Sequence, residues 1–277
     1  MTPSPSRPPS DAHFAGSIPD LYDSLLVPML FAPFAADMAR RVAALAPGRV
    51  LETAAGTGAL TRALAEALPA AAEIVATDLN PPMLQRAELT GTARPVSWQP
   101  ADAMALPFDD GRFDVVACQF GAMFFPHKPS AFAEARRVLR PGGVLLFSVW
   151  DRLQANDFVA TVQAVLDRLF PADPPRFMDR TPHGYFEPAA IRRDLADGGF
   201  DAAPGIDTLA LTSRAPSAMA AAVAYCQGTP LRAELEARAA VASLADVTTA
   251  CAAALQDRFG SGEIEGQIRA HVVSVSR

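Results

Sequence analysis

The amino-acid sequence predicts an α/β fold in which a mostly parallel sheet carries helices on both faces. The chain has 277 residues, 50% of them hydrophobic, and can bury a core of that size. Five segments with the composition of buried strands alternate with segments of helical spacing, and this alternation requires right-handed crossovers and parallel strands. These five strands are expected at 50–51, 73–78, 96–99, 113–120 and 144–150.

The residues before the first strand divide into a tail and a helical stretch. Residues 1–18 are rich in Pro and Ser and are expected to be disordered. Residues 21–44 are apolar at helical spacing, and Pro28 and Pro33 are expected to break them into two or three short helices.

The chain after residue 150 is expected to complete the same domain. A Pro-rich loop at 171–188 is long for a compact domain, which favours a functional role. We expect residues 19–150 to form the core and residues 151–277 to add a helical cap over a substrate pocket, made by the insertions 151–190 and 214–266. The other elements expected are helices at 158–169 and 188–200, strands at 206–213 and 271–276, an Ala-rich helix from 215 to about 259, and a turn at 140–143 before the fifth strand.

Charge and composition exclude several classes of protein. The net charge is -6, and no run of Lys and Arg is long enough to follow a phosphate backbone, so we expect no nucleic-acid partner. Three widely spaced cysteines are typical of a reducing compartment. The N-terminus lacks the apolar core of a signal peptide, and no uninterrupted apolar run reaches the roughly 18 residues of a membrane span. We expect a cytoplasmic protein, monomeric or homodimeric, that acts on a small molecule.

The stretch 49–58 predicts a ligand-binding turn. Within it, a short apolar strand at 50–51 leads into small residues at 54–58, and a helix follows. Backbone N–H groups therefore lie at the positive end of that helix, beside the carboxyl end of the strand. Open α/β sheets bind nucleotide-like ligands at this edge. A dinucleotide fingerprint would need a small residue where Thr61 stands, which counts against NAD, and Ala59 and Leu60 exclude a phosphate-binding P-loop.

The ends of the next three strands carry polar side chains. Asp78 lies 20 residues beyond Gly58 and can accept hydrogen bonds from the two hydroxyl groups of a ribose, or alternatively cap the following helix. Met83, in that helix, can lie on an adenine ring. Asp102 ends the third strand and can accept a hydrogen bond from an exocyclic amine. Gln119 and Phe120 end the fourth strand at the same edge.

With these residues the chain resembles the class I S-adenosylmethionine-dependent methyltransferases, and among them the UbiE-like branch that acts on small molecules. The resemblance covers residues 20–150 and is carried by the segments 50–58, 76–84, 101–108, 113–116 and 134–143. It implies a Rossmann-like, doubly wound, mostly parallel sheet of seven strands. It also implies S-adenosylmethionine as cofactor and S-adenosylhomocysteine as product.

The resemblance also implies roles for individual residues. The loop 52–58 would surround the methionine part of the cofactor, Asp78 would hold the ribose, and Asp102 with the region of Met104 would frame the adenine. Tyr22 resembles a tyrosine that closes over the cofactor in relatives, and Ala54 replaces the first glycine of the family. The implied cofactor-binding residues are Tyr22, Glu52, Ala54, Gly56, Gly58, Asp78, Leu79, Met83, Asp102, Ala103, Met104, Gln119 and Phe120.

Methyl transfer by in-line displacement depends mainly on positioning, and a general base is optional. Aromatic and apolar residues at 120 and 123–125 can form a wall beside the methyl group or simply belong to the core. Three side chains are candidates for contact with the acceptor: His127, His183 and Tyr185. We expect no metal ion, because Asp151 at the end of the fifth strand has no second carboxylate or Asn beside it in the sequence.

The leading hypothesis is therefore a methyltransferase for a small organic acceptor, with O- or C-methylation favoured. Two alternatives remain. One is an NAD-dependent oxidoreductase, and the other is a noncatalytic protein that binds S-adenosylmethionine, since a fold does not by itself determine function.

Overall fold

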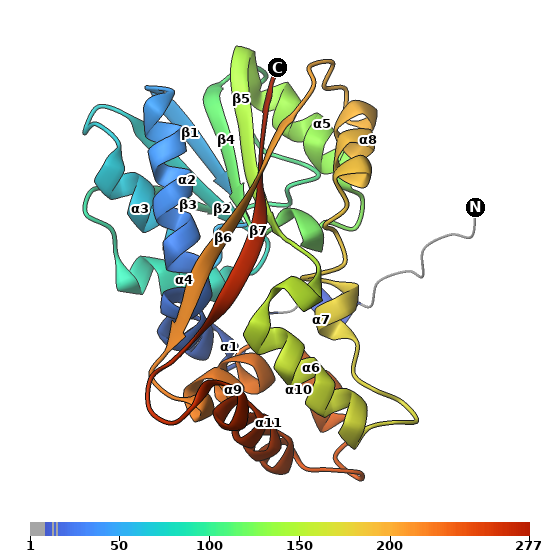
Figure 1. Cartoon of the computed structure of the whole chain (residues 1–277). Coiled ribbons are helices and arrows are strands. Elements are labelled where there is room, and N and C mark those ends of the chain that lie inside the picture. The colour runs from blue at the N-terminus through green and yellow to red at the C-terminus, as the bar shows by residue number, and fades with distance from the viewer. Residues whose placement is uncertain (1–8, 13, 15) are drawn as a thin grey trace.

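A seven-stranded sheet forms the centre of the protein (Figure 1). The structure is a computed structural model and describes residues 9–12, 14 and 16–277. The strand order is β3-β2-β1-β4-β5-β7-β6, and β7 runs in the opposite direction to the other six strands. This confirms the predicted fold class. The strands are β1 (Arg49–Thr53), β2 (Glu73–Asp78), β3 (Ser97–Pro100), β4 (Phe113–Gln119), β5 (Leu139–Trp150), β6 (Gly205–Ala215) and β7 (Ile264–Ser276).

Alternating side chains of the central strands face two separate helical layers. Val50 and its sheet neighbour Val115 pack on one face, against α2 (Ala32–Ala44) and α3 (Ala59–Ala67). Leu51 and Val116 pack on the other face, with α5 (Lys128–Val138) and α8 (Pro188–Asp197). Figure 1 shows these two pairs of helices on opposite sides of the sheet. α4 (Pro81–Thr90) covers β2 and β3.

Two strands, β5 and β7, begin several residues earlier than the sequence predicted. β5 includes residues 140–143, expected as a turn, because Leu139 pairs with Phe113 and the register shifts before Val144 pairs with Val115. β7 begins at Ile264 instead of residue 271. The reason is its long antiparallel pairing with β6, which runs from Gly205 opposite Ser274 to Ala215 opposite Ile264.

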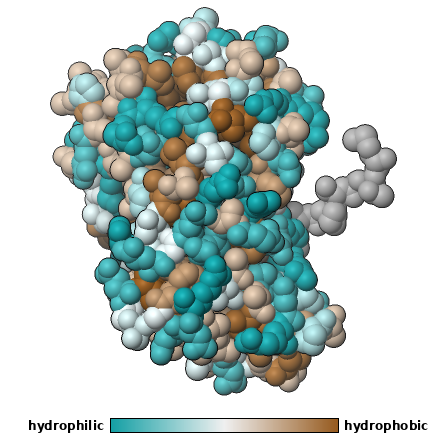
Figure 2. Space-filling model, viewed as in Figure 1, coloured by the Kyte–Doolittle hydropathy of each residue, from teal (hydrophilic) through white to brown (hydrophobic). Residues whose placement is uncertain are grey.

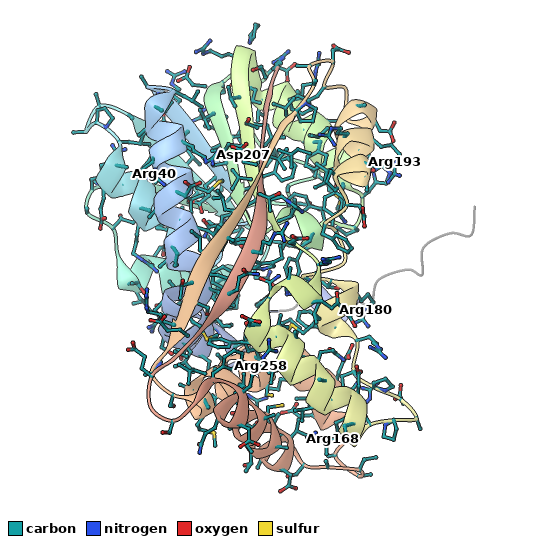
Figure 3. All side chains as sticks on the ribbon, viewed as in Figure 1. Arg40, Arg168, Arg180, Arg193, Asp207 and Arg258 are labelled. Atoms are coloured by element: carbon teal, nitrogen blue, oxygen red, sulfur yellow. The ribbon has the colours of Figure 1, made fainter. Side chains whose placement is uncertain are left out.

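A group of helices covers one end of the sheet as a cap (Figure 1). The single Ala-rich helix expected at 215–259 is instead three helices, because Ser217 and Ser243 each accept a backbone N–H and start new helices, and Gly228 and Pro230 interrupt the first. The cap consists of α6 (Asp157–Leu169), α7 (Phe177–Arg180), α9 (Ala218–Gln227), α10 (Leu231–Glu236) and α11 (Leu244–Phe259). Arg258 of α11 pairs with Asp157 of α6 at 2.7 Å (Figure 3).

The helical stretch before β1 is continuous from Ile18 to Ala44, so the predicted breaks at the two prolines are wrong. It comprises α1 (Ile18–Leu21), a wider π-helical segment η2 (Tyr22–Phe31) and α2. Pro33 lies in the first turn of α2, where its missing N–H leaves no partner unsatisfied, and Pro28 lies inside η2.

By length and composition alone, the run 18–44 could cross a membrane: its most apolar window has a mean hydropathy of 1.2. Within the fold, 44% of that window is buried. Phe34 and Met38, for example, are fully enclosed. A buried core helix can have the same length and the same apolar composition as a membrane span.

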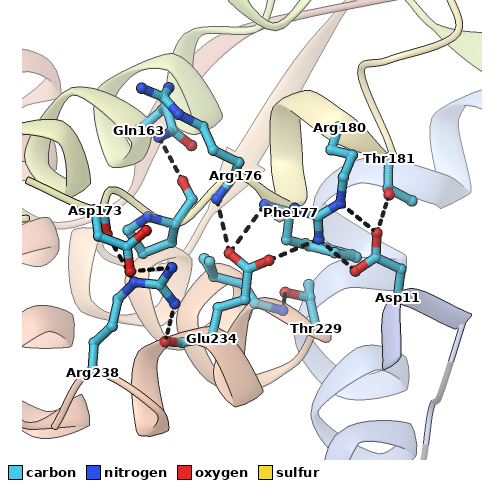
Figure 4. A network of polar contacts seen from close by, with 12 residues as sticks. Asp11, Gln163, Asp173, Arg176, Phe177, Arg180, Thr181, Thr229, Glu234 and Arg238 are labelled. Carbon is cyan, nitrogen blue, oxygen red and sulfur yellow. Dashed lines mark hydrogen bonds and ion pairs between the residues drawn. The ribbon is translucent and has the colours of Figure 1, made fainter. Parts of the chain in front are cut away.

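The N-terminal segment is attached to the cap where the structure describes it. The tail predicted as disordered includes residues 1–8, 13 and 15, which lie outside the described residues. Pro9–Ala12 form one short 3-10 helix, η1, and differ from that prediction. The carboxylate of Asp11 is buried because it accepts hydrogen bonds from Arg180 at 2.6 and 2.9 Å and from Thr181 Oγ1 at 2.5 Å (Figure 4). On the face shown in Figure 2, apolar patches are small and interspersed with hydrophilic residues.

Candidate active site

A cavity of about 160 Å³ opens at the carboxyl ends of β1, β2 and β4. The sequence placed the predicted cofactor residues at these ends because parallel strands finish at one edge of a sheet. All of the predicted cofactor residues except Gly58 line this cavity. Gly58 instead begins α3 with a left-handed backbone, φ +82°.

Asp78 connects two loops at the edge of the cavity. Its Oδ2 accepts the backbone N–H of Gly56 at 2.8 Å, and its Oδ1 accepts the backbone N–H of Asn80 at 2.8 Å. Burial raises the pKa of this carboxyl, while these hydrogen bonds act in the opposite direction. Asp78 therefore shapes the loop after β1 as well as facing the cavity, and the residue that begins α4 is Asn80 rather than Asp78.

Glu52 is the second buried carboxylate of the cavity. Thr61 Oγ1 donates a hydrogen bond to its Oε2 at 2.6 Å, which explains why a hydroxyl residue occupies the position of the third small residue in a dinucleotide fingerprint. Burial, together with the nearby Asp78, raises the pKa of Glu52 to about 8. A third carboxylate, Asp102, accepts the backbone N–H of Met104 at 2.8 Å. This cavity thus favours a ligand that brings positive charge or hydrogen-bond donors.

The backbone is strained on both sides of the cavity. Ala54 follows β1 and Phe120 follows β4, and each adopts φ +53°, a left-handed conformation that non-glycine residues rarely take. Gly121 lies against Ala54 so closely that a Cβ atom on Gly121 would overlap the Cβ of Ala54. Strain of this kind persists where surrounding structure imposes it, and it clusters at functional sites.

A second, apolar cavity of about 60 Å³ lies between the sheet edge and the cap. Phe120 stacks on Trp150 with ring centroids 3.7 Å apart, and Tyr22 stacks on Phe31 at 4.9 Å. The two cavities are adjacent because they share an aromatic wall, defined by the residues that line both: Phe14, Tyr22, Phe31, Phe120 and Phe124.

Only one of the three candidate acceptor residues adjoins a cavity. His183 lines the apolar cavity, and its Nδ1 donates a hydrogen bond to the carbonyl oxygen of Asp151 at 2.8 Å. Burial lowers the pKa of His183 to about 4, so the imidazole is neutral at pH 7.

The structure does not bring His127 or Tyr185 to either cavity. His127 is used as the N-cap of α5, where its Nδ1 accepts the backbone N–H of Ser130 at 3.2 Å. The ring of Tyr185 packs against the ammonium group of Lys128, 4.6 Å from its centroid. Of the predicted wall residues, Met123 is buried and lines neither cavity, whereas Phe125 lines the first.

Sequence reasoning missed several residues that line the cavities. Trp150 could have been found, since it ends a strand at the same edge as Asp78 and Phe120. Phe14 gave no signal because it is an isolated aromatic residue in a Pro- and Ser-rich segment. Tyr225 and Thr229 gave no signal because both lie within the stretch 215–259, which the sequence predicted only as an Ala-rich helix.

Comparison with known proteins identifies the part of the chain that builds the first cavity. Residues 51–147 match the family model described as a methyltransferase domain. This segment is a methyltransferase domain. The resemblance predicted from the sequence is thereby confirmed, and the family implies S-adenosylmethionine as cofactor.

A curated relative supports the same assignment over a limited length. The ubiquinone/menaquinone biosynthesis C-methyltransferase UbiE of Burkholderia mallei (strain SAVP1) is 46% identical over 113 residues, which are 39% of this chain and 46% of the relative. The chain therefore matches less than half the length of its curated relatives.

Solved structures share the fold of the methyltransferase domain over most of the chain. A candidate methyltransferase from Bacillus halodurans C-125 superimposes with a TM-score of 0.53 at 20% identity, covering 87% of this chain and 97% of the other. The YcgJ protein of Bacillus subtilis gives a TM-score of 0.54 at 18% identity, with coverage of 87% and 98%. At these identities the similarity establishes the fold alone.

The residues of the methyltransferase domain fit the cofactor that the family implies. Thr57 Oγ1 and Gln119 Oε1 are buried at this cavity without a hydrogen-bond partner among the described residues. Buried polar atoms normally have partners, so both are suited to a ligand with donors. The carboxylate of Asp78 suits a cationic or hydroxyl group of the ligand, and the carboxyl group of Glu52 suits a hydrogen-bonding group.

A metal site was not expected from the sequence. Within the described part of the chain, no three side chains of His, Cys, Asp or Glu gather as metal ligands would. The prediction that the protein binds no metal ion stays a prediction.

Proposed function

We propose that the whole chain is an S-adenosylmethionine-dependent methyltransferase that transfers a methyl group to a small organic acceptor, on oxygen or carbon. The observation that supports this best is the aromatic wall shared by the two cavities. On one side lies a cavity with the carboxyl groups of Glu52, Asp78 and Asp102, and on the other lies an apolar cavity. A group held in the first can therefore meet a molecule held in the second only at this wall.

The cofactor supplies a methyl group on a positively charged sulfur. Asp78 provides negative charge, and Asp78 and Glu52 both provide hydrogen-bonding oxygens for the polar parts of such a ligand. The stacked rings of Phe120 and Trp150 exclude water beside the wall, and aromatic faces tolerate a cation.

Positioning supplies most of the rate enhancement in this proposal. Holding two reactants in line contributes about 7–11 kcal/mol in well-oriented cases, whereas a general base adds a factor of roughly 10² to 10⁴. His183 is a weak base because its pKa is about 4. The residues of this chain therefore act mainly by orienting the acceptor and keeping water out.

The acidic balance of the chain supports a small-molecule substrate in the cytoplasm. The net charge of -6 opposes binding to nucleic acids. Whether the protein is a monomer or a homodimer stays a prediction.

Calorimetry with S-adenosylmethionine, S-adenosylhomocysteine and NAD tests the proposal. We expect both sulfur ligands to bind and NAD to bind weakly or not at all. Tight NAD binding without binding of the sulfur ligands would establish the oxidoreductase alternative instead. Incubation with methyl-labelled S-adenosylmethionine and a panel of phenols, enols and active methylene compounds, followed by mass spectrometry, then distinguishes an enzyme from a noncatalytic binding protein.

A further inference from the structure

We propose that the apolar cavity is the acceptor site and that it selects an uncharged, mainly apolar molecule that presents a hydroxyl group to Nε2 of His183. This inference rests on the proposed function, because it assigns the acceptor to the cavity on the far side of the aromatic wall. It assigns a substrate class to residues that lie mostly outside the methyltransferase domain segment 51–147.

The lining of this cavity carries no ionised side chain. None of its described residues is Asp, Glu, Lys or Arg. The carboxylate of Asp151, whose carbonyl oxygen binds His183, is directed into other contacts, since its Oδ2 pairs with Arg269 Nε at 3.0 Å and its Oδ1 accepts the backbone N–H of Arg152 at 2.7 Å. Nε2 of His271 also lies 3.5 Å from Oδ1 of Asp151. A carboxylate, phosphate or ammonium group on the acceptor would be buried without an opposite charge in the lining, which is costly.

Two of the polar side chains around the cavity are already occupied by the protein. Thr229 Oγ1 donates to the carbonyl oxygen of Tyr225 at 2.8 Å and accepts the backbone N–H of Leu231 at 3.2 Å. Asn156 Oδ1 accepts the backbone N–H of Arg269 at 2.8 Å, and its Nδ2 donates to the carbonyl oxygen of Arg152 at 3.2 Å. These groups shape the cavity and leave little capacity for a ligand.

His183 differs from them because one of its nitrogens has no partner. Nδ1 must carry the proton, since it donates to the carbonyl oxygen of Asp151, and Nε2 therefore presents a lone pair. Among the described residues no hydrogen bond to Nε2 is present. Nε2 is also not fully enclosed, although only 7% of the residue is exposed. The imidazole lies beside Trp150, with centroids 6.1 Å apart. Nε2 is thus the ring nitrogen that is left for a ligand in the cavity that His183 lines.

A hydroxyl group is the donor that satisfies both constraints. It can donate to Nε2, and it is uncharged at neutral pH, whereas an aliphatic amine would bring an ammonium charge into a lining without carboxylates. The aromatic residues of the lining, including Phe177 and Tyr225, favour an apolar or ring-bearing body for the same molecule. The contact orients the acceptor whether oxygen or carbon receives the methyl group.

Titration calorimetry on the full chain tests this selectivity. The protein is saturated with S-adenosylhomocysteine and titrated with a set of small neutral phenols, each matched with its methyl ether and with a carboxylated analogue. We expect the phenols to bind, and the ethers to bind about 5- to 100-fold more weakly because Nε2 loses its donor. The carboxylated analogues should be weaker still. Ethers that bind as well as phenols, carboxylates that bind better, or no binding by any neutral phenol would overturn the proposal.

Substitution of His183 identifies the group responsible. In His183→Phe, which keeps a ring of similar size, the preference for phenol over ether should disappear, while the affinity for S-adenosylhomocysteine should change less than twofold. In His183→Gln, whose carbonyl oxygen can accept, part of the preference should return. His127→Phe, on the surface outside both cavities, is the matched control and should retain the full preference. A preference that persists in His183→Phe would show that another group makes the contact.

Failure of the proposed function can be distinguished from failure of the proposed acceptor selectivity. If wild-type protein does not bind S-adenosylhomocysteine, the proposed function is wrong. The phenol and ether titrations can then be repeated on the protein alone, where the presence or loss of the His183-dependent preference still decides the selectivity of the cavity.

Discussion

The backbone N–H of Gly56 lies 2.8 Å from Oδ2 of Asp78, so the loop after β1 is attached to the end of β2. Asp78→Ala removes this attachment together with the predicted contact to the ribose. We expect the affinity for S-adenosylhomocysteine to fall about 10- to 100-fold, since charge-assisted hydrogen bonds contribute about 1.5–3 kcal/mol. Calorimetry measures the effect, and Asp114→Ala, at the opposite edge of the sheet, is the control. Unchanged affinity in Asp78→Ala would show that this carboxylate does not hold the cofactor.

Gly121 is predicted to be required by its distance from Ala54. Gly121→Ala should destabilise the fold by about 1–3 kcal/mol, because the new methyl group overlaps the Cβ of Ala54. The double variant Gly121→Ala with Ala54→Gly should recover part of this loss, since it removes the closer overlap and leaves the one with Cys118 Sγ. Urea unfolding of the wild type, both single variants and the double variant measures the coupling. Additive effects would contradict the contact.

The raised pKa of Glu52 predicts how stability depends on pH. The folded protein binds the proton of Glu52 more tightly than the unfolded chain, with a pKa of about 8 against 4.5. This contribution to stability is therefore complete below about pH 4.5 and is lost as pH rises toward 8. Denaturant unfolding between pH 5 and 8 should show a decline that is shallower in Glu52→Gln. An identical slope in the two proteins would mean that Glu52 ionises normally.

The ion pair between Asp11 and Arg180 is predicted to hold the N-terminal segment against the cap (Figure 4). Asp11→Asn should cost about 1–3 kcal/mol and should speed both proteolysis near the N-terminus and release of S-adenosylhomocysteine, because Phe14 belongs to the aromatic wall. Limited proteolysis and ligand dissociation rates are the measurements. Arg193→Gln breaks an exposed pair with Asp194 and should change neither rate.

The sheet and the first cavity were predictable because both follow from local pattern. Apolar strands that alternate with helices define the order of the core, and the carboxyl ends of parallel strands bring Asp78, Asp102 and Gln119 together without knowledge of any tertiary contact. The breaks at Pro28 and Pro33 were predicted wrongly because the local rule ignores the π-helical geometry and the tolerance of a first turn.

The acceptor side was harder to predict because its contacts join distant parts of the chain. His127 follows the fourth strand closely and was a candidate for contact with the acceptor, yet its ring nitrogen caps a helix. His183 reaches the cavity through a hydrogen bond to Asp151, 32 residues earlier. Asp11 meets Arg180 across 169 residues. No periodicity or spacing encodes such pairs.

The aromatic wall also marks a division within the gene product. Of the residues that line the apolar cavity, only Phe120 and Phe124 fall within the segment 51–147 that this chain shares with other methyltransferase domains. All the rest lie at residues 14–31, before β1, or at residues 150–268, from the end of β5 onward. Substitutions that change the choice of acceptor can therefore accumulate before β1 and after residue 147, while the segment that binds the cofactor stays constant. One methyltransferase domain can in this way serve different substrates.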